Sequence, residues 1–368
     1  MNAAAVLHRV AIPLHEPFRI ASGAVAVKES ILIELSVDGV TGFGEASPMP
    51  GSFYSPETPE SSWRELEQRL IPCWLANPLA HPEEVAARLE EVSPDPFARA
   101  GLEGACWDLL ARRSGKPLFE LLGSRKRPIP SGVAVGLYDT LEELLDRVGR
   151  FLAQGYRRVK IKIQPGWDIE PVRAIRERFG RIPLMVDANA SYTLEDAPIF
   201  EELDRFQLMM YEQPLGKDAL EEAAELQRRL RTPICADESA DSPAALKKIL
   251  RLGAAKILNI KVQRVGGLAV ARRMHDLAAG AGMGCWLGTM PELGVASAQA
   301  LHLATLDGFT YPTDVEASLR WFVDDLVHPL IEIDREGYLH IPEGPSSGWT
   351  LDRAKLERYQ VACLRLHP

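Results

Sequence analysis

The chain has 368 residues, of which 46% are hydrophobic and 25% are charged, and these proportions exclude a disordered or fibrous protein. A chain of this length is expected to form about two domains. Its formal net charge of -9 argues against nucleic acid as a partner, because surfaces that bind the phosphate backbone are basic.

The five cysteines are widely spaced and include no Cys-x-x-Cys pair, so we expect buried thiols in a reducing compartment rather than a zinc or redox site. They are Cys73, Cys106, Cys235, Cys285 and Cys363. The first residues, MNAAAVLHRVAIPLHEP, lack a basic segment followed by an apolar core, and no stretch approaches the roughly 18 apolar residues of a membrane helix. These features predict a cytoplasmic protein with no membrane partner.

Strand-like and helical segments occur in separate blocks over residues 1–125. The strand-like runs HRVAIPLHEPFRIA and ESILIELSVDGVTGFGEA come first, and the helical patterns SSWRELEQRLIPCWL, HPEEVAARLEEV and ARAGLEGACWDLLARR follow. Blocks of this kind are typical of an α+β domain, which we predict for these residues.

Over residues 126–325 a short apolar run recurs roughly every 25 residues, with a helical pattern between successive runs. The runs are VAVGL, RVKIKI, PLMVDAN, LMMYEQ, PICADE, KILNIK, GCWLGT and, most weakly, GFTYP. Strands that alternate with helices pair in parallel through right-handed crossovers, and about eight such units favour a barrel over an open sheet. The predicted fold class is therefore α/β, with a TIM-like barrel of the (β/α)7β type.

Residues 326–368 follow the last barrel unit. The segment PLIEIDREGYLHIPEGPSSGWTLDRAKLERY has hairpin-like strands on either side of residues 334–337. We expect this segment to return and pack on the N-terminal domain.

Acidic residues stand where three successive barrel strands are predicted to end. Asp187 ends the third strand, Glu212 the fourth and Asp237 the fifth. Catalytic groups of parallel barrels occupy these ends, and three converging carboxylates repel one another unless a cation neutralises them. Oxygen donors alone favour Mg²⁺, with Mn²⁺ as a second choice. Each acid on its own could be a solvated loop residue or a helix cap, but the repetition favours a metal site.

Lysines flank these acids on both sides. Lys160 and Lys162 end the second strand and point to the same side of it, and Lys261 ends the sixth strand. The two groups should reach the site from opposite directions. A lysine with an ordinary pKa of about 10.4 is a poor base at neutral pH, and a nearby cation such as Lys160 or the metal lowers that pKa. The set predicts that Lys162 removes a proton α to a carboxylate, giving an enolate that the metal stabilises.

These residues also carry a resemblance to the enolase superfamily, in its muconate-lactonizing-enzyme subgroup. VKIKI, VDANASY, YEQPL, ADES and NIKVQRVGG resemble its barrel-strand signatures in order, and ARAGLEGACWDLLARRSGKPLFELLG is similar to the helix and loop that join its capping domain to the barrel. The resemblance implies that the three acids hold Mg²⁺ and that Lys162 and Lys261 are catalytic, with Lys160 in support. It also implies a capping domain built from residues 1–125 and 326–368, a small carboxylate substrate and a homo-oligomer.

Within the subgroup the chain is most similar to o-succinylbenzoate synthases and N-succinylamino acid racemases. The segments EPFRIASGAVAVKESILIEL and GFGEASPMPGSFYSPET resemble their capping loops, and Arg264 matches an arginine found in that family. The implied reactions are the dehydration that forms o-succinylbenzoate in menaquinone biosynthesis, the racemisation of N-succinylamino acids, or both. Residues expected to bind substrate or support the site are Asn189, Glu238, Arg264, Arg19, Ser22, Tyr54, Met290 and Glu292.

Three other functions stay open on the sequence alone. TDVEAS is similar to the Asp-x-Asp with which dipeptide epimerases hold a substrate amine, but here it reads Asp314-Val315-Glu316. A muconate-type cycloisomerase would use the same lysines and acids. A non-catalytic barrel that binds carboxylates would keep its function after Lys162 is replaced by Ala.

Overall fold

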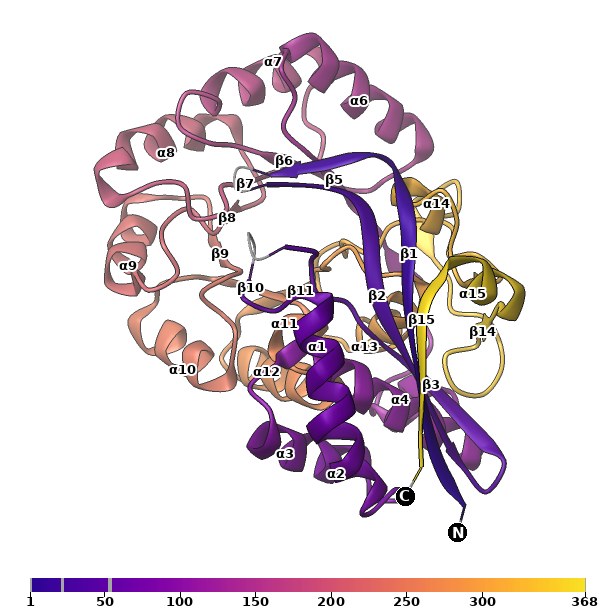
Figure 1. Ribbon diagram of the computed structural model, residues 1–368. Coiled ribbons are helices and arrows are strands. Elements are labelled where there is room, and N and C mark those ends of the chain that lie inside the picture. The colour runs from indigo at the N-terminus through magenta and orange to yellow at the C-terminus, as the bar shows by residue number, and fades with distance from the viewer. Residues whose placement is uncertain (1, 21–22, 52–54, 368) are drawn as a thin grey trace.

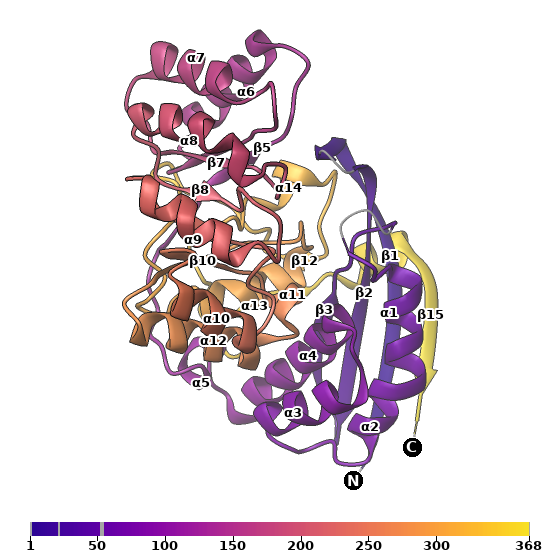
Figure 2. The ribbon, with the colours of Figure 1, turned by 90° about the vertical axis from the view of Figure 1, so that its left-hand side faces the viewer.

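The computed structural model describes residues 2–20, 23–51 and 55–367, without the side chains of residues 18–20 and 23. Figure 2 shows an antiparallel sheet with its helices on one side of the molecule and a barrel on the other. The two longest strands of that sheet extend past its helices and reach across the end of the barrel (Figure 1).

The antiparallel sheet has four strands in the order β15-β1-β2-β3. Their bounds are β1 (Ala3–Ile20), β2 (Gly23–Val37), β3 (Val40–Ala46) and β15 (Gln360–Leu366). Because β15 pairs with β1, the last strand of the chain completes the sheet that the first strand begins, and the two termini lie close together (Figure 1). Alternate residues such as Leu7, Ile31 and Ile33 are fully buried on one face.

The capping helices cover this buried face. They are α1 (Pro59–Glu65), a π-helical turn η1 (Leu66–Leu70), α2 (Ile71–Leu75), α3 (Pro82–Val92), α4 (Pro96–Ser114) and the short α5 (Leu118–Leu121). Helix α4 lies directly on β3, and this contact requires glycine. A Cβ at Gly44 would stand 2.0 Å from the carbonyl oxygen of Gly101, and one at Gly101 would stand 2.6 Å from the amide of Ala46.

Seven parallel strands form the barrel wall in the order β11-β10-β9-β8-β7-β6-β5. Their bounds are β5 (Val133–Val135), β6 (Val159–Lys162), β7 (Leu184–Asp187), β8 (Tyr211–Glu212), β9 (Ile234–Ala236), β10 (Ile257–Ile260) and β11 (Gly284–Leu287). The eighth run, GFTYP, is reduced to two parallel bridges: Phe309 pairs with Cys285 beside β11, and Thr313 pairs with Ser131 beside β5. These bridges join the two ends of the seven-stranded sheet. The predicted α/β class with a (β/α)7β barrel and a capping domain is confirmed.

Helices follow the strands around the outside of the barrel (Figure 1). They are α6 (Leu141–Gln154), α7 (Ile169–Phe179), α8 (Ala197–Leu203), α9 (Leu220–Arg229), α10 (Pro243–Leu252), α12 (Leu268–Gly280) and α13 (Gly294–Leu303), with single 3-10 turns η2 (Leu194–Asp196) and η3 (Asp204–Phe206). Two short helices lie instead toward the capping domain: α11 (Val262–Val265) contacts α4, and α14 (Ser318–Trp321) contacts β1. The ends of the outer helices follow ordinary cap chemistry. Helix α6 begins after Thr140, whose side chain accepts the amide of Glu143, and ends at Gly155 in the left-handed conformation.

The C-terminal segment contacts both parts of the molecule. Its remaining elements are β12 (Val327–His328), β13 (Tyr338–Leu339), β14 (Thr350–Leu351) and α15 (Arg353–Tyr359). Ile333 bridges Leu339 across the predicted hairpin turn, and β13 pairs with β4 (Ile129–Pro130), at the entry to the barrel. Strand β15 then returns to the capping sheet.

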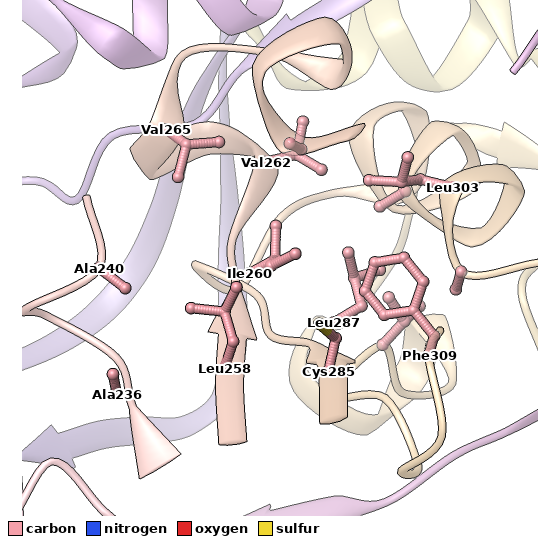
Figure 3. Packing of buried hydrophobic residues seen from close by; sticks show 14 of the residues in the cluster. Ala236, Ala240, Leu258, Ile260, Val262, Val265, Cys285, Leu287, Leu303 and Phe309 are labelled. Carbon is pink, nitrogen blue, oxygen red and sulfur yellow. The ribbon is translucent and has the colours of Figure 1, made fainter. Parts of the chain in front are cut away.

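Side-chain alternation decides which barrel residues face the helices. Leu258 and Ile260 of β10 join Cys285 and Leu287 of β11 in the apolar layer beneath the helices, together with Phe309 (Figure 3). The residues between them must therefore face the barrel interior. A second apolar layer fills the deep end of the barrel interior, and it consists of Met185, Met210, Cys235, Ile257 and Trp286. Polar residues occupy the interior above it.

The prediction of buried thiols was only partly right. Cys106, Cys235 and Cys285 are buried, but Cys73 is half-buried and Cys363 is exposed. Cys363 lies on β15, the edge strand of the capping sheet, whose neighbouring residues Leu364 and Leu366 pack on the core. None of the helices in the described ranges is long and apolar enough to cross a membrane.

Two buried acids of the capping domain dock the barrel helices. The Glu103 carboxylate accepts the backbone amides of Leu268 (2.7 Å) and Ala269 (2.8 Å) at the start of α12. Glu45 accepts the amides of Leu293 (2.9 Å) and Ala296 (3.0 Å) at the start of α13. Each carboxylate accepts amide groups that a helix N-terminus leaves without intrahelical partners, so side chains of the capping domain cap two helices of the barrel.

Replacing Glu103 by Ala should destabilise the fold, because it removes the acceptor of two helix amides and of the Trp107 indole N–H (2.8 Å). We expect a loss of about 1–3 kcal/mol in the free energy of unfolding. Urea unfolding measures it, with Glu91→Ala on the exposed face of α3 as control. Equal stability of the two variants would contradict a capping role for Glu103.

Candidate active site

The charged residues predicted at the strand ends lie inside the barrel and are buried. Lys160 is 4% exposed, Lys162 9% and Lys261 6%. The three predicted acids are at most 1% exposed. Charges buried to this degree must be paired, since an isolated charge in a low-dielectric interior is very costly.

Lys162 is held by the end of the next strand. Its ammonium donates to Asp187 Oδ2 (2.6 Å) and to Asn189 Oδ1 (2.6 Å). Asn189 adopts a left-handed conformation (φ 42°), and its backbone amide donates back to Asp187 Oδ1 (3.0 Å). The turn after β7 therefore orients the carboxylate and the lysine together.

Glu212 lies at the centre of the acidic residues. Its Oε1 accepts the Asn259 amide (2.7 Å), and its Oε2 lies 3.2 Å from Lys160 Nζ. Burial and the carboxylates of Asp187 and Asp237 together raise the pKa of Glu212 to about 8, against the opposing effect of Lys160. The three acids therefore lie close enough to repel one another.

Asp237 is bound by two cations. Lys261 Nζ lies 2.9 Å from its Oδ2, and Arg264 binds its Oδ1. Burial opposes the negative charge of Asp237, but Arg264 and Lys261 outweigh it and hold the pKa of this carboxyl well below its usual range. The turn after β8 also fixes the position of Asp237, because Gln213 Oε1 accepts a hydrogen bond from the backbone amide of Asp237 (3.0 Å).

The lysines of β6 and β10 approach one cavity from opposite sides. Three strands, β7, β8 and β9, separate β6 from β10 around the wall. Lys160, Lys162 and Lys261 nevertheless line the same cavity, together with Asp187 and Asn189. Its remaining wall is formed by Met49, Ala134, Thr289, Met290, Pro291, Asp314, Glu316 and Trp321.

A further buried ion pair closes the eighth position of the barrel. Asp314 binds Lys160 Nζ, and its Oδ1 accepts Arg158 Nη2 at 2.7 Å. Both cations also lie over the ring of Trp286, at 4.9 Å for Lys160 and 5.1 Å for Arg158. Burial works against the charge of Lys160, but Asp314, Glu212 and Asp187 together raise its pKa, so Lys160 stays protonated.

Within the described part of the chain, no group of three or more His, Cys, Asp or Glu side chains is arranged as a ready-made metal site. Lysine and arginine side chains instead form ion pairs with the three acids. The donor set still fits a hard cation, since it is made only of carboxylates, and the buried Glu212 Oε2 accepts no hydrogen bond although Lys160 Nζ lies 3.2 Å away. A divalent ion would relieve the mutual repulsion that raises the pKa of Glu212.

Comparison with known proteins assigns the family. The model of the enolase C-terminal domain-like family matches residues 143–355, and that of the mandelate racemase/muconate lactonizing enzyme N-terminal domain matches residues 2–123. The chain belongs to the enolase superfamily. The resemblance inferred from the strand-end motifs is thereby confirmed.

Relatives within the superfamily match nearly the full chain. An o-succinylbenzoate synthase of Geobacillus kaustophilus is 43% identical over 355 residues, covering 96% of this chain and 94% of the relative. An N-succinylamino acid racemase of Amycolatopsis is 42% identical and covers 93% of each. The crystal structure of an enolase superfamily member from Listeria innocua superposes with a TM-score of 0.95 at 34% identity, covering 100% of this chain and 99% of that one.

The other predicted site residues fall into three groups. Met290 lines the lysine cavity, whereas Glu292 turns back to accept the Met290 amide (3.0 Å) and is not part of the cavity wall. Glu238 supports the site at one remove, since its Oε1 accepts the Asn189 side-chain amide (3.0 Å). Ser22, Tyr54 and the side chain of Arg19 lie outside the described residues.

Sequence reasoning missed several residues of this site. Asn259 and Arg158 precede Lys261 and Lys160 by two positions, so the same strand alternation could have placed both in the barrel interior. Met49 gave no such signal, because it comes from the capping domain and reaches the cavity only in the folded chain.

Replacing Asp314 by Asn should destabilise this superfamily member strongly, since it removes the carboxylate that pairs with both Arg158 and Lys160 and leaves the buried Arg158 guanidinium without that counter-charge. Breaking a buried pair in this way costs roughly 3–5 kcal/mol. A double-mutant cycle with Arg158→Met, read by urea unfolding, should give a double variant less destabilised than the sum of the single variants. Strictly additive effects would contradict the coupling.

Proposed function

We propose that this protein is a Mg²⁺-dependent enzyme that removes a proton α to a carboxylate, most similar in function to o-succinylbenzoate synthase, N-succinylamino acid racemase, or both. The observation that carries the proposal is the pair of buried ammonium groups, Lys162 and Lys261, which line one cavity from opposite sides of the barrel. The full-length relatives with these two names support the same assignment.

The proposed metal ligands are Asp187, Glu212 and Asp237. Two observations support these ligands. All three donors are carboxylates, and both burial and the neighbouring carboxylates disfavour the charge of Glu212. When bound, Mg²⁺ would supply a Lewis acid for the substrate carboxylate. It would also compete with Lys162 for Asp187 and with Lys261 for Asp237. The ion pairs that hold the two amines in the metal-free protein would therefore weaken.

The lysines take distinct parts in the proposed reaction. Lys162, as the neutral amine, accepts the α-proton of the bound carboxylate. Lys160 cannot share this role, because Asp314 keeps it protonated, and it supplies a fixed positive charge beside Lys162. Lys261 faces the opposite side of the α-carbon.

The two candidate reactions diverge only after proton removal. In a dehydration, Lys261 stays a cation beside the enolate, and the leaving hydroxyl group departs as water with the proton that Lys162 has taken. In a racemisation, Lys261 returns a proton to the opposite face, so the configuration inverts. Both use the same residues, and both relatives are nearly equally similar to this chain.

The structure argues against the dipeptide epimerase alternative. An epimerase would need the acids at positions 314 and 316 to receive a substrate ammonium. Asp314 is already neutralised by Lys160 and Arg158. Glu316 lies 3.3 Å from Arg320 and accepts the Ala134 amide (2.8 Å). With both acids paired to cations of this chain, a substrate amine would have to displace a buried ion pair.

The proposed two-base geometry predicts a face-specific loss of exchange. In D₂O, the wild type should exchange the α-proton of both enantiomers of an N-succinylamino acid, as followed by proton NMR. Lys162→Ala should abolish exchange of one enantiomer and Lys261→Ala that of the other, each by about 10²-fold or more. Lys247→Ala, an exposed lysine on α10, is the control. Undiminished exchange in Lys162→Ala would contradict its role as a base, and an absence of any turnover in the wild type would favour the non-catalytic barrel.

Magnesium affinity should rise with pH up to about 8. Glu212 must lose its proton to bind a cation, and burial raises its pKa to about 8 in the metal-free protein, so binding below that pH releases a proton. Titration calorimetry at pH 6.5 and 8.5, in two buffers of different ionisation enthalpy, measures both effects. Glu212→Gln should remove the proton release. Affinity that does not change with pH would contradict Glu212 as a ligand.

A further inference from the structure

Gln263 lies two residues beyond Lys261, in the short helix α11, and is 3% exposed. Its side chain leaves the barrel and binds the capping domain. Oε1 accepts the backbone amide of Ser47 (3.0 Å), and Nε2 donates to the backbone carbonyl of Glu45 (2.9 Å). One amide group therefore holds the backbone at the end of β3 through both a donor and an acceptor.

The chain segment held by Gln263 leads directly to the cavity. Met49 follows Ser47 by two residues, is 3% exposed, and lines the cavity with Lys162 and Lys261. It also packs with Met290 from the loop after β11, so the two methionines form a joint apolar wall. The capping domain thus contributes part of the surface that faces the reacting groups.

A second anchor holds the same segment from within the capping domain. Lys28, 1% exposed on β2, donates to the carbonyl oxygens of Ser47 (3.1 Å) and Pro48 (3.1 Å). Lys28 fixes the segment to its own sheet, whereas Gln263 fixes it to the barrel. Of these two anchors, Gln263 is the one that connects the methionine wall with the turn that carries Lys261.

We propose that Gln263 is a positioning residue that sets the place of the Met49 wall relative to Lys261 and thereby controls substrate affinity and selectivity. The inference rests on the proposed function, in which Lys261 works beside the α-carbon. The wall contacts the part of the substrate that does not react, so a displaced wall weakens binding more than it slows proton transfer.

Loss of the Gln263 amide would leave two buried backbone groups, one on Ser47 and one on Glu45, without partners. The segment would move to regain hydrogen bonds, since unpaired buried polar groups are costly. Glu45 would still cap α13 through its side chain, so the capping domain stays docked while residues 47–49 shift.

The chain offers a matched control in Gln299. This buried glutamine of α13 also bridges the two domains, since its Nε2 donates to the carbonyl oxygens of Phe43 (2.8 Å) and Gly104 (3.1 Å). It does not line the lysine cavity. Gln263→Met and Gln299→Met therefore both remove an interdomain amide, and only Gln263→Met releases the segment that leads to Met49.

The test compares both variants with the wild type by steady-state kinetics of N-succinylamino acid racemisation and by hydrogen–deuterium exchange of residues 45–49 without substrate. We expect Gln263→Met to raise KM roughly tenfold or more, to change kcat less than about threefold, and to alter the preference between small and large side chains. Amide exchange at Ser47 should speed up by roughly tenfold or more. Gln299→Met should leave KM and exchange at Ser47 near wild-type values.

Two results would overturn the proposal: equal effects of both variants on KM, or unchanged exchange at Ser47 in Gln263→Met. Lys28→Met keeps the test valid if Gln263→Met fails to fold. It should loosen the same segment from the other side and should also raise KM. A wild type that neither exchanges the α-proton of N-succinylamino acids nor forms o-succinylbenzoate would refute the proposed function instead, while the hydrogen–deuterium comparison would still decide whether Gln263 holds the segment.

Discussion

Buried charge at the open end of the barrel is the constraint on which the rest of the structure depends. Three carboxylates and three lysines share a space from which water is nearly excluded, and each must meet an opposite charge. Asp187, Asp237 and Glu212 each lie beside a lysine, while burial and, after it, the neighbouring acids raise the pKa of Glu212. A divalent cation would take the place of the lysines as the counter-charge of Asp187 and Asp237 and would relieve the repulsion at Glu212.

The same constraint explains the eighth position of the barrel. That strand is reduced to two bridges, yet the residue after it, Asp314, supplies a carboxylate for Lys160 and Arg158. Trp286 lies under both cations as an apolar floor. Closing the barrel thus completes the neutralisation of Lys160, and it uses an acid that an epimerase would need for its substrate.

The capping domain is tied to the barrel by the chemistry of helix ends and backbone amides. Glu103 and Glu45 cap α12 and α13 across the domain boundary, and Gln263 and Gln299 bind capping backbone in the other direction. Such contacts fix the relative position of two domains more closely than apolar packing alone, because hydrogen bonds depend on direction. A site with one wall from each domain needs that accuracy.

The sequence by itself determined the barrel, the acids and lysines at its strand ends, and the superfamily. These follow from local periodicity: alternation puts Lys160 and Lys162 on one side of a strand, and parallel strands bring all such ends to one rim. The tertiary structure alone decided that Asp314 is paired with Arg158, and that Met49 forms a wall beside Lys261. Those contacts join residues more than a hundred positions apart. No short-range pattern encodes them, because they depend on how the barrel closes and how the capping domain packs on it.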